Sequence, residues 1–164
     1  MKHIYLIRHA KSDWNNPKLS DFNRPLNKRG KRNAPFMGQK LNELTPNLDL
    51  IIASPAKRAL QTVKAICKEI NYNESEIRFD ESVYHSSYQN LNKIINDLDN
   101  NINTIALVGH NPGLTNFSNY LTNNYIDNIV TCGIVKIEFD IDNWNEIIEG
   151  LGTKVFYIYP KMYE

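Results

Sequence analysis

Residues 4–10 read IYLIRHA, an almost continuous apolar run that ends in an arginine, a histidine and an alanine. An apolar run of this length is typical of a strand that is covered on both faces. Two similar runs lie further along the chain, at residues 48–53 and 104–108. The three runs predict neighbouring strands of a buried, parallel sheet.

Helical periodicity fills the segments between these strands. Apolar side chains recur three or four positions apart within residues 34–44, 59–70, 91–98 and 114–121. Such stripes predict helices that each bury one face. An alternation of strands and helices along the chain indicates an α/β fold.

The C-terminal region has a different pattern. Residues 135–141 alternate between apolar and charged side chains, as expected of a strand with one solvated face. Residues 155–159 predict one more strand before Pro160, and we expect the two strands to pair as an antiparallel edge. The complete prediction is a three-layer α/β/α fold with a mostly parallel central sheet, in a single domain of residues 1–164.

Composition limits the possible functions. The chain has 164 residues, a formal net charge of +1, 41% hydrophobic and 23% charged residues, which are ordinary values for a soluble globular domain. The near-zero charge argues against a broad surface for nucleic acids or membranes. No leader precedes the first strand and no apolar run approaches the ~18 residues that span a bilayer, so we expect a cytoplasmic protein. Cys67 and Cys132 form no CxxC pair, and Cys67 falls on the apolar face of a predicted helix.

Polar motifs follow each of the three apolar strands. These motifs are RHAKS at residues 8–12, SPAKRA at residues 54–59 and GHNPG at residues 109–113. Ligands of open α/β sheets bind outside the carboxyl ends of the strands, so we expect the motifs to meet at one crevice. Helices are predicted to begin in the second and third motifs, and their free N–H groups favour an anion.

The charged side chains in these motifs suit a phosphoryl group. Arg8 and Arg58 each offer a planar fork that matches two phosphate oxygens. His9 and His110 belong to the residue type that serves as nucleophile, acid or cation near neutral pH. Taken singly, the first motif also fits a solvated strand end, Arg58 in the second fits a surface ion pair, and the third fits a turn with a capping histidine. Their joint occurrence at three strand ends favours a site.

The same motifs resemble those of a known family. Residues 8–10 are similar to the Arg-His-Gly opening motif of the histidine phosphatase superfamily, with alanine in the glycine position. Residues 54–62 and 108–110 resemble its second and third motifs. The short chain and residues 20–30, SDFNRPLNKRG, resemble the SixA-type phosphohistidine phosphatases of this superfamily, which has a phosphoglycerate mutase-like fold.

The resemblance implies a reaction and roles for four residues. His9 would attack phosphorus in line and become a phosphohistidine, while Arg8 and Arg58 hold the phosphoryl oxygens. A cationic His110 would complete the pocket, and water would then release phosphate. No cofactor and no metal are implied, in agreement with the presence of only four histidines and no paired-ligand spacing.

Five further residues are weaker candidates. Four of them could contact the substrate. Alternatively, Ser12 could cap a turn, Asn15 could be a loop residue, Arg24 could form a structural salt bridge, and His85 could be a surface histidine. Glu81 lies roughly where related mutases place a general acid, although it also fits a solvated loop carboxylate.

Three functions remain open at this point. The first is a phosphohistidine phosphatase that acts on a protein such as a histidine phosphotransfer domain. It is favoured because imidazole leaves without a strong acid, and because the short stretch between Arg58 and His110 leaves no room for a roof over the crevice. The second is a phosphatase of small monoesters such as a sugar phosphate or nucleotide, which a functional Glu81 would favour. The third is a phosphate-binding module without turnover.

Overall fold

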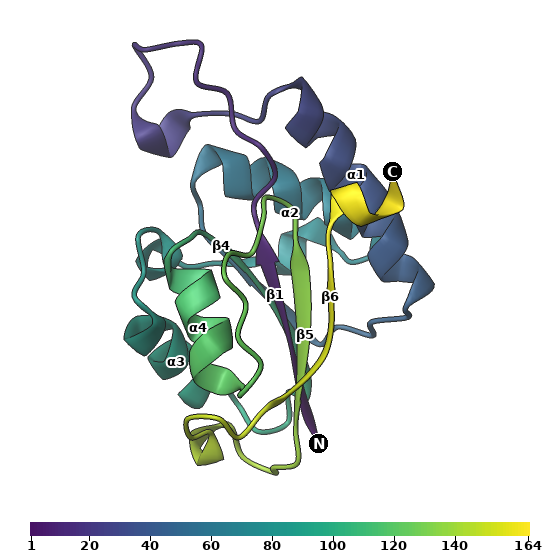
Figure 1. Ribbon diagram of the computed structural model, residues 1–164, viewed down its shortest axis with the longest axis vertical. Coiled ribbons are helices and arrows are strands. Elements are labelled where there is room, and N and C mark those ends of the chain that lie inside the picture. Colours follow the sequence, from purple (N-terminus) through teal and green to yellow (C-terminus); the bar gives the residue numbers. More distant parts are fainter.

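The computed structural model describes all 164 residues, and it contains one six-stranded sheet between two layers of helices (Figure 1). The sheet order is β3-β2-β4-β1-β5-β6. The strands are β1 (Lys2–Arg8), β2 (Leu50–Ala53), β3 (Arg78–Phe79), β4 (Thr104–Gly109), β5 (Ile134–Phe139) and β6 (Thr153–Ile158). The helices are α1 (Lys28–Glu43), α2 (Lys57–Ile70), α3 (Tyr88–Asn96) and α4 (Gly113–Leu121).

Strand directions confirm the predicted fold. β3, β2, β4 and β1 are parallel neighbours, whereas β5 is antiparallel to both β1 and β6. The predicted strands are present with ends displaced by one or two residues, which is the ordinary uncertainty of such boundaries. β1 lies inside the sheet between β4 and β5, so its end is flanked by strands on both sides.

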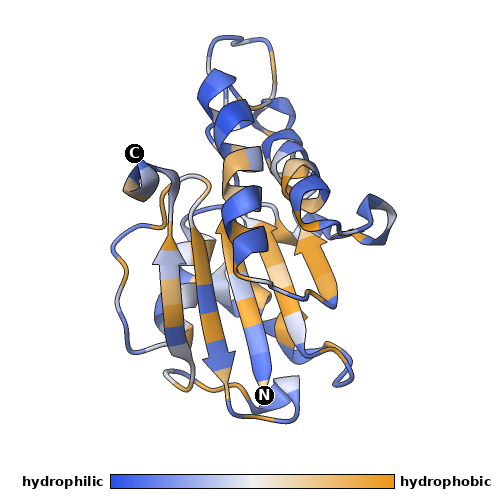
Figure 2. Ribbon diagram, turned by 90° about the vertical axis from the view of Figure 1, so that its right-hand side faces the viewer, coloured by the Kyte–Doolittle hydropathy of each residue, from blue (hydrophilic) through white to orange (hydrophobic).

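Each face of the sheet packs against its own pair of helices. Ile4 and Leu6 of β1 belong to the cluster that contains the apolar stripes of α3 and α4. Tyr5 and Ile7 belong to the cluster formed with α1 and α2. This alternation follows from the period of two in a strand, and Figure 2 shows hydrophobic strands behind helices whose outer sides are hydrophilic.

One glycine brings α1 against the segment that follows β1. A Cβ atom on Gly30 would lie 2.2 Å from the carbonyl oxygen of Lys11, so only glycine allows this approach. The Asn27 side chain caps α1 by accepting a 2.8 Å hydrogen bond from the Gly30 N–H. The Asn27 N–H donates to the same Lys11 carbonyl at 3.0 Å. These contacts fix the backbone two residues after His9.

The remaining geometry bears on three expectations from the sequence. None of the helices combines the length and the apolar character that a membrane span requires. No group of three or more histidine, cysteine, aspartate or glutamate side chains is arranged to hold a metal ion. Cys67 and Cys132 are both buried free thiols, and Cys67 packs in the core as predicted.

Candidate active site

The carboxyl ends of three parallel strands converge on one pocket of about 310 Å³. Arg8 at the end of β1 pairs with Gly109 at the end of β4, and Ala53 at the end of β2 pairs with Val108. All predicted site residues except Asn15 and Glu81 line this pocket. Those that line it are Arg8, His9, Ser12, Arg24, Arg58, His85 and His110.

The pocket holds His9 in a single tautomer. His9 Nδ1 lies 2.7 Å from the carbonyl oxygen of Ala10, and a carbonyl can only accept, so Nδ1 carries the proton. Burial is the main cause that lowers the pKa of His9 to about 3; the bond to Ala10 opposes it, and the positive charges of Arg58 and Arg8 act in the same direction as burial. At neutral pH the ring is therefore neutral with its lone pair on Nε2, which is the form that acts as a nucleophile.

His110 lies beside His9, with ring centroids 5.0 Å apart. Its Nε2 is 2.8 Å from the Ser54 hydroxyl, and Nδ1 is buried without a partner. The expectation of a cationic His110 is wrong. Burial lowers its pKa to about 3, and the neighbouring His9 and the charge of Arg58 act in the same direction, so the ring is neutral at neutral pH.

Two arginines, Arg8 at the end of β1 and Arg58 in the first turn of α2, frame the histidines. Arg8 donates from Nη1 to the carbonyl oxygen of Ile129 at 3.0 Å, and Arg58 donates from Nη1 to the main-chain oxygen of Asp21 at 2.7 Å. The Nε atoms of both guanidinium groups are buried without a hydrogen-bond partner. These unsatisfied donors mark the region as one that an anion would complete.

Arg24 also belongs to the pocket, and the ion pair that the sequence allowed as an alternative is present as well. Its Nη1 donates to the Ser12 hydroxyl at 2.6 Å, and its Nη2 donates to Asp21 Oδ1 at 2.8 Å. The guanidinium carbon lies 3.5 Å from the ring centroid of Trp14, a cation–π stack. Because the Ser12 oxygen accepts from Arg24, its own hydrogen is free to donate to a ligand.

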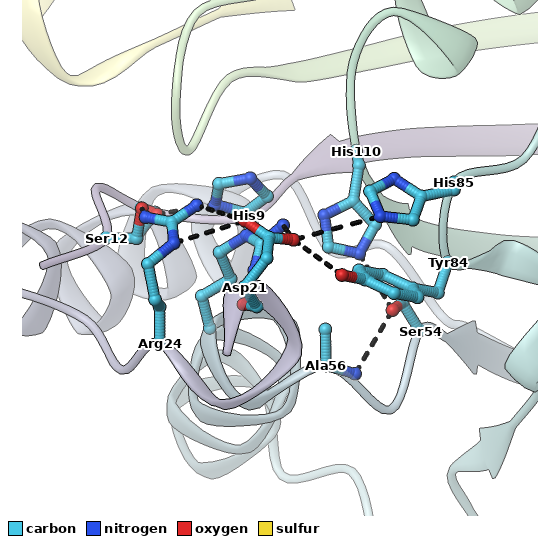
Figure 3. Close-up of polar contacts among 11 residues, drawn as sticks. His9, Ser12, Asp21, Arg24, Ser54, Ala56, Tyr84, His85 and His110 are labelled. Atoms are coloured by element: carbon cyan, nitrogen blue, oxygen red, sulfur yellow. Dashed lines mark hydrogen bonds and ion pairs between the residues drawn. The ribbon is translucent and has the colours of Figure 1, made fainter. Parts of the chain in front are cut away.

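Asp21 is one of the pocket residues that the sequence analysis missed; the others are Lys11, Trp14, Asn111 and Thr131. Figure 3 shows its carboxylate between Arg24 and Tyr84, whose hydroxyl donates to Oδ2. Burial acts to raise the pKa of Asp21, but the hydrogen bonds from Tyr84 and Arg24 and the charge of Arg58 hold it well below its usual range. A signal was present in the sequence, since Asp21 stands three positions before Arg24 inside the SixA-like segment.

His85 lies at the mouth of the pocket. Its side chain is 70% exposed and stacks on Tyr84 with ring centroids 3.9 Å apart. Its Nε2 is 3.9 Å from Asp21 Oδ2, and its backbone is left-handed, with φ of 55°. A non-glycine residue in that region is uncommon and costs free energy, which contacts of the surrounding chain must offset.

The structure does not bring Asn15 or Glu81 to the pocket. Asn15 is exposed, and its N–H donates to Asp13 Oδ1 at 2.7 Å within a local turn. Glu81 is exposed as well, and it does not line the pocket. The reason is the turn that Asp80 makes by accepting from the Ser82 N–H at 2.9 Å, which directs Val83 into the core and leaves Glu81 on the solvent side. The proposed general acid therefore has no structural support.

The comparison with protein families agrees with this geometry. Residues 4–97 match the family described as the histidine phosphatase superfamily, branch 1. The chain belongs to the histidine phosphatase superfamily. It is accordingly a hydrolase of the phosphatase class.

Two relatives illustrate how far the sequence similarity extends. An uncharacterised chloroplast protein of Arabidopsis thaliana is 29% identical over 153 residues, which cover 88% of this chain and 70% of the relative. The mitochondrial serine/threonine-protein phosphatase Pgam5 of Drosophila ananassae is 38% identical over 76 residues, which cover 46% of this chain. The matched part is only 26% of the Drosophila protein.

A solved structure shows the same fold over the whole chain. The SixA protein of Agrobacterium tumefaciens, described as a candidate phosphohistidine phosphatase, superimposes with a TM-score of 0.84. The alignment covers 97% of this chain and 98% of the SixA chain at 22% identity. The predicted phosphoglycerate mutase-like α/β architecture is thereby confirmed.

The two neutral histidines of this histidine phosphatase predict a pH effect on stability. Their pKa values of about 3 lie below the ordinary value of 6.5, so the unfolded chain binds more protons between these limits and stability falls as pH falls through that window. When the pH falls from 7 to 5, we expect each of these two histidines to lower the free energy of unfolding by about 2 kcal/mol. Urea unfolding of the native chain and of His9→Asn at both pH values measures this.

The asparagine variant supplies the comparison, because its side chain at position 9 cannot titrate. We expect it to lose about 2 kcal/mol less than the native chain between pH 7 and pH 5. The low pKa of Asp21 does not interfere, since that carboxylate stays ionised throughout this range. An equal loss in the two proteins would show that His9 is not held neutral.

Proposed function

We propose that the chain is a phosphohistidine phosphatase that removes the phosphoryl group from a histidine of another protein. His9 Nε2 attacks phosphorus in line and forms a P–N bond, while the P–N bond to the substrate imidazole breaks. Water then attacks the phosphorus of phospho-His9, which releases inorganic phosphate and restores the neutral His9. Arg8 and Arg58 stabilise the charge on the equatorial oxygens in both steps.

The observation that carries this proposal is that the carboxylate in the pocket accepts hydrogen bonds from two arginines and a tyrosine hydroxyl, which favour its ionised form. Asp21 is the only carboxylate among the lining residues, and its pKa is held well below the usual range. An alkoxide leaving group needs a positioned proton donor, whereas a phosphohistidine that carries a proton on its other ring nitrogen releases neutral imidazole without one. The first step also exchanges one P–N bond for another, so it needs little driving force.

The short connection between α2 and β4, beside the site, supports a protein substrate. Between α2 and β4 there are only β3, α3 and short 3-10 turns, so this stretch contains no inserted element that could roof the pocket. Small phosphate esters are usually enclosed during turnover, whereas a histidine on a protein surface needs an open approach. The description of the Agrobacterium SixA protein points to the same substrate class.

A second candidate is a phosphatase of small monoesters. A polar hollow of about 400 Å³ adjoins the phosphate pocket and shares His85, His110 and Asn111 with it. Hydroxyl and amide side chains that line this hollow could bind the hydroxyls of a sugar. They belong to Ser86, Ser87, Gln89 and Asn116.

The test compares two substrates under identical conditions. A phosphorylated histidine phosphotransfer domain and glycerol 2-phosphate, a monoester with an alkoxide leaving group, are each incubated with the chain, in the presence of a chelator. We expect the phosphorylated domain to lose phosphate at least about 100-fold faster, measured as kcat/KM, because only the ester lacks a good leaving group. Glu81→Gln is the companion variant, and we expect both rates to be unchanged.

Other outcomes separate the alternatives. Faster hydrolysis of the ester, with a loss in Glu81→Gln, would favour the monoesterase and return Glu81 to the role of acid. Phosphate binding without release from either substrate would favour a binding module.

A further inference from the structure

The arginines of the phosphate pocket already hold a carboxylate. Asp21 Oδ1 accepts from Arg24 Nη2 at 2.8 Å and from Nε at 3.2 Å, and Oδ2 accepts from Arg58 Nη2 at 3.1 Å. Arg58 Nη1 donates to the main-chain oxygen of Asp21 at 2.7 Å. Both terminal nitrogens of Arg58 are therefore bonded to Asp21, and these are the nitrogens that offer a fork to two phosphoryl oxygens.

The exposed fractions of the side chains show that the carboxylate covers the two arginines. The Arg24 and Arg58 side chains are 9% and 6% exposed, whereas that of Asp21 is 41% exposed. The carboxylate thus lies on the solvent side of two buried cations. Buried guanidinium groups without a counter-charge are unfavourable, so the contact stabilises the pocket as it stands.

Contacts from a distant segment hold the carboxylate in this position. The Tyr84 hydroxyl donates to Asp21 Oδ2, and the Phe22 ring meets the Tyr84 ring edge-on with centroids 5.1 Å apart. His85 Nε2 is 3.9 Å from the same carboxylate oxygen (Figure 3). The segment around residue 21 is therefore tied both to α2 and to the loop before α3.

We propose that Asp21 is the resident counter-anion of the phosphate site and that it sets how tightly the site holds phosphate. A phosphate anion bound to Arg58 would share its terminal nitrogens with the carboxylate, and at close range their negative charges repel each other. Asp21 therefore weakens phosphate binding and promotes the release of product. The inference rests on the proposed function only in taking this pocket as the phosphoryl site.

Calorimetric titration with inorganic phosphate tests the inference without any turnover. Asp21→Asn keeps the shape of the side chain and an acceptor oxygen but removes the charge. We expect it to bind phosphate about tenfold more tightly than the native chain does. Unchanged or weaker binding would overturn the proposal, and weaker binding would show that Asp21 chiefly orients the arginines.

Asp13→Asn is the matched control, since it removes the same charge from the same segment. Asp13 Oδ1 accepts from the Asn15 N–H and contacts no arginine of the pocket, so we expect the phosphate affinity to stay within about twofold. An equal gain in Asp13→Asn would attribute the effect to overall charge and would overturn the specific role of Asp21.

A second variant carries the test if Asp21→Asn does not fold. Tyr84→Phe removes one donor to the carboxylate while the charge of the pocket stays the same. A carboxylate held by fewer bonds is displaced more easily, so we expect phosphate to bind about two- to threefold more tightly. Unchanged or weaker binding in this variant contradicts the proposal. A chain that binds phosphate as expected but leaves phosphohistidine intact would refute only the proposed function.

Discussion

Replacement of His9 by alanine is expected to abolish phosphate release from a phosphohistidine protein, with a loss of at least about 1000-fold in kcat/KM. The reason is that, in the proposed mechanism, His9 Nε2 accepts the phosphoryl group in the first step, and we do not expect the other buried histidine to replace it. The Nε2 of His110 already lies 2.8 Å from the Ser54 hydroxyl. Phosphate release and the phosphoenzyme, trapped by rapid acid-free quenching and followed by ³¹P NMR, are the two measurements.

His3→Ala is the control for the loss of a histidine. His3 lies on β1 and is paired with Glu138 at 3.5 Å, away from the pocket. We expect this variant to retain the activity of the native chain. A phosphoenzyme that persists in His9→Ala would identify a different acceptor and would contradict the assignment.

The second large effect is expected at Arg58. Arg58→Ala removes a cation whose Nε is buried without a partner, and we expect kcat for the first step to fall by about 100- to 1000-fold. Arg58→Lys keeps the charge but not the planar fork, so most of this loss should remain. Single-turnover transfer from the phosphorylated domain to His9 measures the step directly.

Arg32→Ala is the matched control because Arg32 is exposed on α1 and does not line the pocket. Native rates of transfer are expected for it. If Arg58→Lys restored the native rate, charge alone would suffice, and the role of the guanidinium geometry would be refuted.

The fold was largely predictable because its signals are local. The buried run at residues 4–7 and the helical stripes repeat with the period of their own element, and no knowledge of distant residues is needed to interpret them. The convergence of Arg8, Arg58 and His110 followed from a general rule on strand ends. The order of the strands was not predicted, because strands of similar composition do not show in their sequences which other strands lie beside them.

The less predictable features depend on contacts between distant segments. Asp21 lies in a polar stretch without periodicity, and its place is set by Arg58 and Tyr84, which are remote in the sequence. The neutral state of His110 depends on burial among cations, which a sequence does not display. Lys2 is likewise buried, because its ammonium group donates to two carbonyl oxygens and to the Asn103 side chain at the far end of the sheet.

One part of the pocket is built at the end of the central strand β1, and another part is built from loops. The proposed acceptor His9 directly follows a strand that is hydrogen-bonded on both sides, whereas Asp21 and Arg24, together with Tyr84 and His85, come from loops with short 3-10 turns. Loops tolerate substitution and insertion far better than central strands do. New specificities can therefore evolve, or be engineered, by rewriting two loops while the reacting atom and its supporting frame stay the same.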